Sequence, residues 1–218
     1  MIVGLRHAAV WNPDGVVYAR LPGFHLSPEG RAKAAAVGEA LANVPLVAVH
    51  ASPLDRAVET ATLLAEPHGL AVVTDGRLLE WSFWMGWQGM PWARIRERHP
   101  ELLEQYAVDP GKASPQDPLV EAGRRVLEWA AEALEAHPEG LVVGVSHEAP
   151  LIAAMLVDLY GAVSTYHTIR LPHLGAVRLR PGPAERVDLA WYEPGRCHLI
   201  RSWSLLKRRA SRPATGLA

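Results

Sequence analysis

Four cationic or titratable side chains stand just beyond short apolar segments of the chain. Arg6 and His7 follow the segment MIVGL, Arg56 comes shortly after LVAVHAS, and His147 follows LVVGVS. In an open α/β sheet, ligands bind beyond the carboxyl ends of the strands, so these side chains are expected to share one pocket. Guanidinium groups and imidazoles suit a bound phosphate, and an unprotonated imidazole beside it could attack phosphorus.

Each of these residues also has an ordinary structural interpretation. Arg56 is expected in the first turn of a helix that begins near Pro53, where the helix dipole disfavours a cation. Either its side chain is solvated, or an anion such as phosphate bridges it to the helix end. His7 and His147, taken singly, are more often structural than catalytic. Their coincidence with Arg6 and Arg56 at strand ends that should be adjacent favours a functional site.

Apolar runs and helical spacing alternate along most of the chain. The runs that predict buried strands are 2–6, 45–51, 70–73 and 141–146. The segments that predict helices are 27–42, 53–66, 118–136 and 150–160. This alternation predicts an α/β fold, a three-layer α/β/α sandwich with a mostly parallel sheet. Pro/Gly turns separate three further strand patterns, which we expect to pair antiparallel at the C-terminal edge of the sheet: 175–180, 186–192 and 197–203.

We expect a single domain over residues 1–205. An insertion at about residues 76–117 is rich in tryptophan and then turns into a charged helical stretch, and we expect it to cap the carboxyl edge of the sheet. Its aromatic side chains either pack the cap onto the sheet or contact an apolar leaving group, with Trp84, Met85 and Trp87 as candidates. Residues 206–218 form a basic tail that we expect to be disordered.

Composition and charge exclude several classes of partner. The chain of 218 residues has a formal net charge of −1, which gives no global basic field for nucleic acid. No apolar run approaches the ~20 residues that cross a bilayer, and the N-terminal segment predicts a strand and not a signal peptide. The single cysteine, Cys197, offers no intramolecular disulfide and no metal-ligand pattern. We expect a cytoplasmic protein without nucleic-acid or membrane partners, and the oligomeric state stays open, a homodimer included.

The motifs, in their order, resemble those of the histidine phosphatase superfamily, which includes the cofactor-dependent phosphoglycerate mutases. LRHAAVW is similar to the Arg-His signature of that family, and HASPLDRAVETATLLA to its Ser-Pro-Leu-x-Arg-Ala-x-x-Thr-Ala motif. LSPEGRAKAAAVGEAL resembles the intervening helix, LLEWSFWMGWQG the Glu-bearing segment, and VVGVSHEAP the last His motif. The resemblance extends from residue 2 to about residue 203 and implies a phosphoglycerate mutase-like fold.

The resemblance also implies roles for individual residues. His7 would be the nucleophile that forms a phosphohistidine, while Arg6, Arg56 and His147 would hold the phosphoryl oxygens. Glu80 would donate a proton to the leaving oxygen. Elementary chemistry agrees, since a neutral imidazole (pKa ~6.5) is available near neutral pH and guanidinium groups stabilise a transferring phosphoryl group. This chemistry requires neither a metal nor another cofactor.

Three further residues are candidates for the same site. Glu148 adjoins the second histidine, where one branch of the superfamily places its acid, so it could share or replace the role of Glu80. Asn12 stands one place early for a family asparagine that contacts substrate. Arg20, in the first long loop, could reach the pocket or remain exposed.

The expected function is metal-independent hydrolysis of a small phosphorylated metabolite through a phosphohistidine intermediate. Two alternatives remain: phosphoryl transfer of the phosphoglycerate mutase type, and a non-catalytic protein that binds a phospho-ligand. The second is suggested by Ala8-Ala9-Val10, which replace the family's Gly-Glu-Ser/Thr after the nucleophile. A protein phosphohistidine phosphatase is a further option, although the large cap predicts a more enclosed site.

Overall fold

A seven-stranded sheet forms the middle layer of the molecule, in the strand order β3-β2-β4-β1-β5-β6-β7. The structure is a computed structural model, and it describes residues 1–108, 117–179, 189–193 and 196–200, the last two ranges as backbone only. The strands are β1 (Ile2–Arg6), β2 (Leu46–Ala51), β3 (Val72–Thr74), β4 (Leu141–Ser146), β5 (Gly175–Leu179), β6 (Leu189–Glu193) and β7 (Arg196–Ile200). The first four run parallel, and β5, β6 and β7 add antiparallel neighbours beyond β1.

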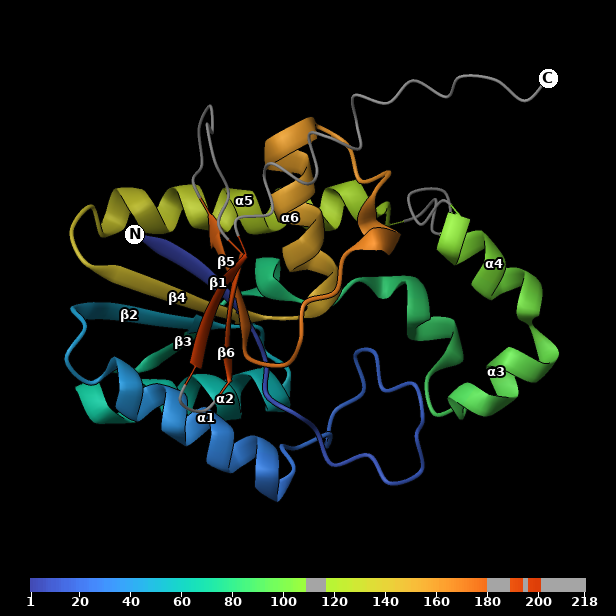
Figure 1. The fold of residues 1–218 in the computed structure, drawn as a ribbon, viewed down its shortest axis with the longest axis horizontal. Coiled ribbons are helices and arrows are strands. Elements are labelled where there is room, and N and C mark those ends of the chain that lie inside the picture. The colour runs from blue at the N-terminus through green and yellow to red at the C-terminus, as the bar shows by residue number, and fades with distance from the viewer. Residues whose placement is uncertain (109–116, 180–188, 194–195, 201–218) are drawn as a thin grey trace.

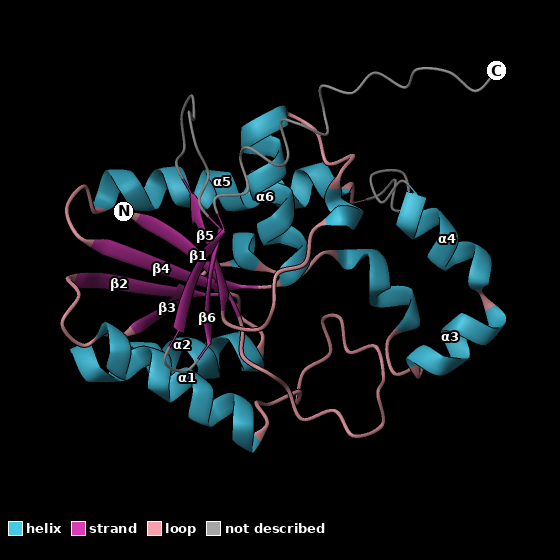
Figure 2. Ribbon diagram, viewed as in Figure 1, coloured by secondary structure: helices cyan, strands magenta, loops and turns pink. Residues whose placement is uncertain are grey.

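Two helix pairs cover the two faces of this sheet (Figure 1). Helices α1 (Pro28–Leu41) and α2 (Asp55–Ala65) lie on one face, and α5 (Leu119–Ala136) and α6 (Glu148–Tyr160) lie on the other. Colouring by secondary structure shows the three layers directly (Figure 2). All six residues of β4 are buried, as expected for a central strand covered on both faces. The predicted three-layer α/β/α fold with an antiparallel C-terminal edge is confirmed.

Local sequence explains where several elements begin. The Ser27 hydroxyl accepts a hydrogen bond from the amide of Gly30 at 3.0 Å, and Pro28 occupies the first turn, so α1 begins as the sequence predicts. Helix α6 was expected from residue 150 but begins at Glu148, because Pro150 is tolerated inside a first turn. Strand β3 is Val72–Thr74 instead of 70–73. The expected tail at 206–218, and the expected strand residues 180, 186–188 and 201–203, lie outside the described residues.

The cap lies beyond the carboxyl ends of the parallel strands (Figure 1). Its elements are the 3-10 turns η2 (Gly76–Leu78) and η3 (Ser82–Trp87), followed by the helices α3 (Trp92–Arg98) and α4 (Pro100–Val108). The loop between β1 and α1 attaches to it, since the amide of Val17 donates to the carbonyl of Met90 at 2.9 Å. Val17 and Ile95 are buried together in a small apolar cluster at this junction. The cap and this loop therefore enclose space above the sheet edge.

Helices α5 and α6 cross at a glycine. A Cβ at Gly123 would lie 2.6 Å from the carbonyl carbon of Ala153, so the backbones could not stay this close with any side chain there. Gly123→Ala is therefore expected to lower the free energy of unfolding by about 1–3 kcal/mol, measured by urea denaturation. Gly86→Ala is the control, because a Cβ at Gly86 would meet no atom within 4 Å. Equal stability of the two variants would contradict this account of the helix crossing.

Candidate active site

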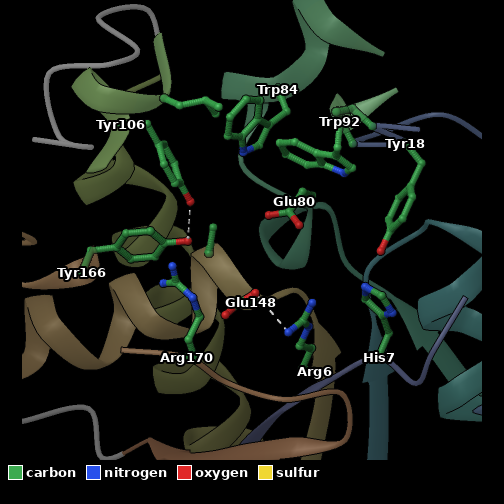
Figure 3. A pocket seen from close by; sticks show the side chains of 14 residues that line it. Arg6, His7, Tyr18, Glu80, Trp84, Trp92, Tyr106, Glu148, Tyr166 and Arg170 are labelled. Atoms are coloured by element: carbon green, nitrogen blue, oxygen red, sulfur yellow. Dashed lines mark hydrogen bonds and ion pairs between the residues drawn. The ribbon is translucent and has the colours of Figure 1, made fainter. Parts of the chain in front are cut away.

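The structure brings six of the predicted side chains together at the carboxyl edge of the sheet. Strands β1 and β4 are paired so that Arg6 lies beside Ser146, which places the next residues, His7 and His147, near each other. Their ring centroids are 5.2 Å apart. Arg56 reaches the same point from the first turn of α2. The other two members of the group, Glu80 and Glu148, face the same cavity (Figure 3).

His7 is held as a neutral imidazole with a defined tautomer. The ring is only 2% exposed, and its Nδ1 lies 2.8 Å from the carbonyl oxygen of Ala8, which can only accept a hydrogen bond. Its Nε2 in turn accepts from Nε of Arg56 at 3.3 Å. Burial, followed by the charges of Arg56 and Arg6, holds the pKa of His7 well below its usual value. The lone pair therefore resides on Nε2, at the cationic end of the cavity.

His147 is a second neutral imidazole, and it has the opposite tautomer to His7. Its Nδ1 accepts from Nη2 of Arg56 at 3.3 Å, so its Nε2 carries the proton and donates to the hydroxyl of Ser52 at 2.9 Å. The side chain is fully buried. Burial, then the charge of Arg56 and the proximity of His7, keeps the pKa of His147 well below its usual value. Arg56 thus lies between two imidazoles that are both uncharged.

The two arginines beside the imidazoles each have a buried donor without a hydrogen-bond partner among the described residues. Arg56 is fully buried, its Nη2 donates to the carbonyl of Ala19 at 2.6 Å, and its guanidinium lies 4.7 Å from the ring centre of Tyr18. Among the described residues, Nη1 of Arg56 and Nε of Arg6 are buried without any hydrogen-bond partner. Buried donors of this kind, on charged groups, are costly unless an acceptor occupies the site. A tetrahedral oxyanion beside Nε2 of His7 would satisfy them.

The two carboxyl groups differ in their surroundings. Burial raises the pKa of Glu80 above its usual value; Arg56 opposes the shift and Glu148 adds to it slightly. One oxygen of Glu80 accepts from the amide of Trp81 at 2.8 Å, and the other lies 3.9 Å from Nδ1 of His147. Glu148 instead forms an ion pair with Arg6 at 3.0 Å and accepts from the amide of Leu171 at 3.2 Å. Burial thus favours the protonated form of Glu80, while Glu148 is paired with Arg6.

Two of the predicted substrate contacts are placed elsewhere. The side-chain amide of Asn12 makes two hydrogen bonds to the backbone of Val16, at 2.9 and 3.1 Å, and so closes a turn of its own loop. Arg20 donates to the backbone carbonyl of Glu80 at 2.5 and 2.8 Å and lies 3.6 Å from Asp117. Neither side chain lines the pocket. In this structure Asn12 shapes the loop and Arg20 holds the segment that carries Glu80, and their contacts with a substrate stay predictions.

The cavity has a volume of about 370 Å³ and extends from the imidazoles to the cap. It is lined by Arg6, His7, Val17, Tyr18, Ala19, Glu80, Trp84, Trp92, Leu103, Tyr106, Glu148, Ala149, Tyr166 and Arg170. The sequence analysis did not find Tyr18, Tyr166 or Arg170. These residues lie outside the long helices and the strands, in segments without a periodic pattern, so only their proximity in the fold reveals them.

Two further properties concern the described residues as a whole. No three or more His, Cys, Asp or Glu side chains in the described part of the chain are grouped so that they could bind a metal ion. None of the helices in these same ranges combines the length and the apolar character that crossing a bilayer requires.

Comparisons with known proteins agree with this geometry. The family model described as histidine phosphatase superfamily (branch 1) matches residues 2–193. An uncharacterised protein of Mycobacterium tuberculosis is 42% identical over 162 residues, which span 70% of this chain and 71% of that protein. Phosphoserine phosphatase 1 of Hydrogenobacter thermophilus is 32% identical over 163 residues, which span 73% of this chain and 76% of that protein. The solved structure of a mycobacterial glucosyl-3-phosphoglycerate phosphatase, complexed with VO3, has a TM-score of 0.72 and 27% identity, covering 81% of this chain and 90% of that one.

Proposed function

Because this chain is a phosphatase that belongs to the histidine phosphatase superfamily, we propose that it hydrolyses small phosphomonoesters without a metal, through a phosphohistidine on His7. The resemblance stated from the sequence motifs is confirmed at the level of the family. The observation that carries the finer proposal is the pair of buried, unpartnered nitrogens on Arg6 and Arg56 beside the Nε2 lone pair of His7. Arg56 contacts His7, which lines the cavity together with Arg6, so a phosphoryl group beside His7 would bring negative charge close to both guanidinium groups.

In the first step, Nε2 of His7 would attack phosphorus. A nitrogen–phosphorus bond forms while the bond between phosphorus and the ester oxygen breaks. The guanidinium groups of Arg6 and Arg56 would stabilise the charge on the phosphoryl oxygens. Glu80, whose raised pKa favours its protonated form, would give its proton to the departing oxygen. The alcohol then leaves as a neutral molecule.

In the second step, water would attack the phosphorus of phospho-His7. The carboxylate left on Glu80 accepts a proton from that water, the phosphorus–nitrogen bond breaks, and phosphate leaves with the imidazole restored. His147 has its lone pair on Nδ1 and can donate to a phosphoryl oxygen only after gaining a proton there. A bound phosphate favours that proton, because a nearby anion raises the pKa of an imidazole.

The proposal predicts a trapped intermediate in the wild-type protein. With a ³²P-labelled aryl phosphate and excess EDTA, rapid quenching is expected to give labelled protein whose label is stable in base and lost in acid. Peptide mapping should place the label on His7. Turnover that requires an added metal, or a label that base removes, would contradict the mechanism.

Two further assays, of 3-phosphoglycerate conversion and of phosphate binding, separate the alternative functions. Phosphoglycerate mutase-type transfer would convert 3-phosphoglycerate to 2-phosphoglycerate faster than it releases phosphate. A non-catalytic binding protein would retain phosphate without labelled protein or turnover. Two relatives that match most of the chain are named as phosphatases, phosphoserine phosphatase 1 and a glucosyl-3-phosphoglycerate phosphatase. Simple hydrolysis is therefore the better supported of the three.

A further inference from the structure

The pocket continues well beyond the phosphoryl site. Trp84, Trp92 and Leu103 line it from the cap, and Tyr166 and Arg170 line it from the segment that follows α6. Figure 3 shows Arg170 and His7 on opposite sides of the cavity, with Arg6 and Glu148 between them. The indole rings of Trp84 and Trp92 lie on another wall of the same cavity, on the side of Glu80.

Two tyrosine hydroxyls at the far side leave one proton without an acceptor. Tyr106 on α4 and Tyr166 on η4 (Tyr166–Thr168) are joined through their hydroxyl oxygens at 3.1 Å. Two hydroxyls carry two protons, and one hydrogen bond between them uses only one, whichever oxygen donates. No described residue makes another hydrogen bond with either oxygen. The pair therefore offers a donor to the pocket.

Arg170 adds a charge to that donor. Its Nη1 donates to the carbonyl of Ile169 at 3.0 Å, and no carboxylate among the described residues forms an ion pair with it. Its guanidinium lies next to the Tyr166 hydroxyl in Figure 3. No printed hydrogen bond joins Arg170 to either tyrosine oxygen in the described chain, and a guanidinium cannot accept one, so the free hydroxyl proton needs an acceptor other than Arg170.

The charges in the pocket also indicate that an anionic group binds near Arg170. Glu148 is paired with Arg6, and the raised pKa of Glu80 favours its neutral form. The phosphoryl group of a substrate would engage the donors of Arg6 and Arg56 that have no partner. Arg170, an exposed residue that lines the other side of the cavity, then remains without an ion pair to any described carboxylate. An anionic group of the leaving alcohol would balance it.

We propose that the substrate is a phosphomonoester whose alcohol carries a carboxylate, which Arg170 and the Tyr106–Tyr166 hydroxyl pair bind. This inference rests on the proposed function, because it takes the phosphoryl group to lie at His7. A cavity of about 370 Å³ is near the lower end of ligand pockets (~300–1,000 Å³), so the leaving group is a small molecule. Arg170 is accordingly a specificity-determining residue.

The test uses three matched esters: 2-phenylethyl phosphate, its 4-carboxy derivative, and the neutral primary amide of that derivative. The wild-type protein is expected to show a kcat/KM at least about tenfold higher for the carboxylate than for the amide, as a charge-assisted hydrogen bond provides. Arg170→Gln should reduce that ratio to within about twofold, mainly through KM for the carboxylate ester. Arg96→Gln, which removes an exposed charge from α3, should leave the ratio unchanged. A wild-type ratio near one, or a preference that survives Arg170→Gln, overturns the proposal.

A binding measurement tests the carboxylate preference independently of the proposed hydrolysis. The affinities of the same esters for His7→Ala, with and without Arg170→Gln, are measured by titration calorimetry. Tighter binding of the carboxylate that depends on Arg170 supports the inference even if no ester is hydrolysed by the wild-type protein. Hydrolysis of all three esters at equal efficiency, with equal affinities, overturns the inference and leaves the proposed hydrolysis intact.

Discussion

His7→Ala is expected to abolish phosphatase activity, with a loss on the order of 10⁴-fold or more in kcat, as removal of a covalent nucleophile produces. The physical reason is the fixed orientation of the neutral His7 ring. Its Nδ1 donates to the carbonyl of Ala8, which leaves the lone pair on Nε2, beside Arg56. We do not expect His147 to replace it, because the side chain of His147 is fully buried and does not line the cavity. The measurement is hydrolysis of an aryl phosphate, together with labelling of the protein.

The control for this substitution is His173→Ala. The ring centroid of His173 lies 5.5 Å from that of His7, so its removal changes the surroundings of the nucleophile without removing the nucleophile. Activity is expected to stay within about tenfold of the wild type, which is small beside the loss expected for a nucleophile. Binding of vanadate to His7→Ala would show that the arginines still form the site. Comparable losses for the two variants would mean that His7 acts only structurally.

The second large effect is expected for Glu80→Gln, and it should depend on the leaving group. A general acid contributes ~10²–10⁴-fold, so kcat for an alkyl phosphate should fall by about that factor. The loss for 4-nitrophenyl phosphate should be much smaller, because nitrophenolate leaves without a proton. Glu148→Gln is the matched comparison, and it should mainly raise KM, since it releases Arg6 from an ion pair. If Glu148→Gln shows the larger loss and the stronger dependence on the leaving group, the two carboxyl groups have exchanged roles.

The pH profile follows from the same two groups. The pKa of His7 is lowered, so the nucleophile stays neutral and active as the pH falls below 6.5. The pKa of Glu80 is raised, so the acid form persists above the usual carboxyl range and is lost as the pH rises through that higher value. Hydrolysis of an alkyl phosphate should therefore decline on the alkaline side. That decline should be absent in Glu80→Gln, and its persistence there would assign it to another group.

The sequence predicts the phosphoryl end of this site well, for a physical reason. Arg6, His7 and His147 each follow a short buried strand, and a buried strand has a distinctive apolar pattern with a definite end. Parallel strands bring their ends to one edge, so adjacency in space follows from the pattern alone. Arg56 was ambiguous from the sequence, and the structure shows a fully buried side chain between two imidazoles.

The leaving-group end could not be predicted in this way. Tyr166 and Arg170 lie in and beyond a short 3-10 turn, where no periodicity links a residue to a face. Asn12 and Arg20 were assigned by residue type and approximate position, yet their side chains bind the backbone of Val16 and of Glu80. Whether a polar side chain in an irregular loop faces a ligand or its own backbone depends on a few ångströms of tertiary packing. Sequence pattern carries no information at that scale.

Strand β1 has hydrogen-bonded neighbours on both sides, parallel β4 and antiparallel β5, and the proposed nucleophile directly follows its last residue. Opening its ladder would require the centre of the sheet to come apart, whereas the cap lies at the edge of the sheet. The proposed reactive atom, Nε2 of His7, is thus held by the centre of the sheet. The side chains that would contact the alcohol belong largely to the cap and to the segment after α6. Lineages descended from such a scaffold can exchange one set of metabolites for another while the bond-breaking apparatus remains as it was.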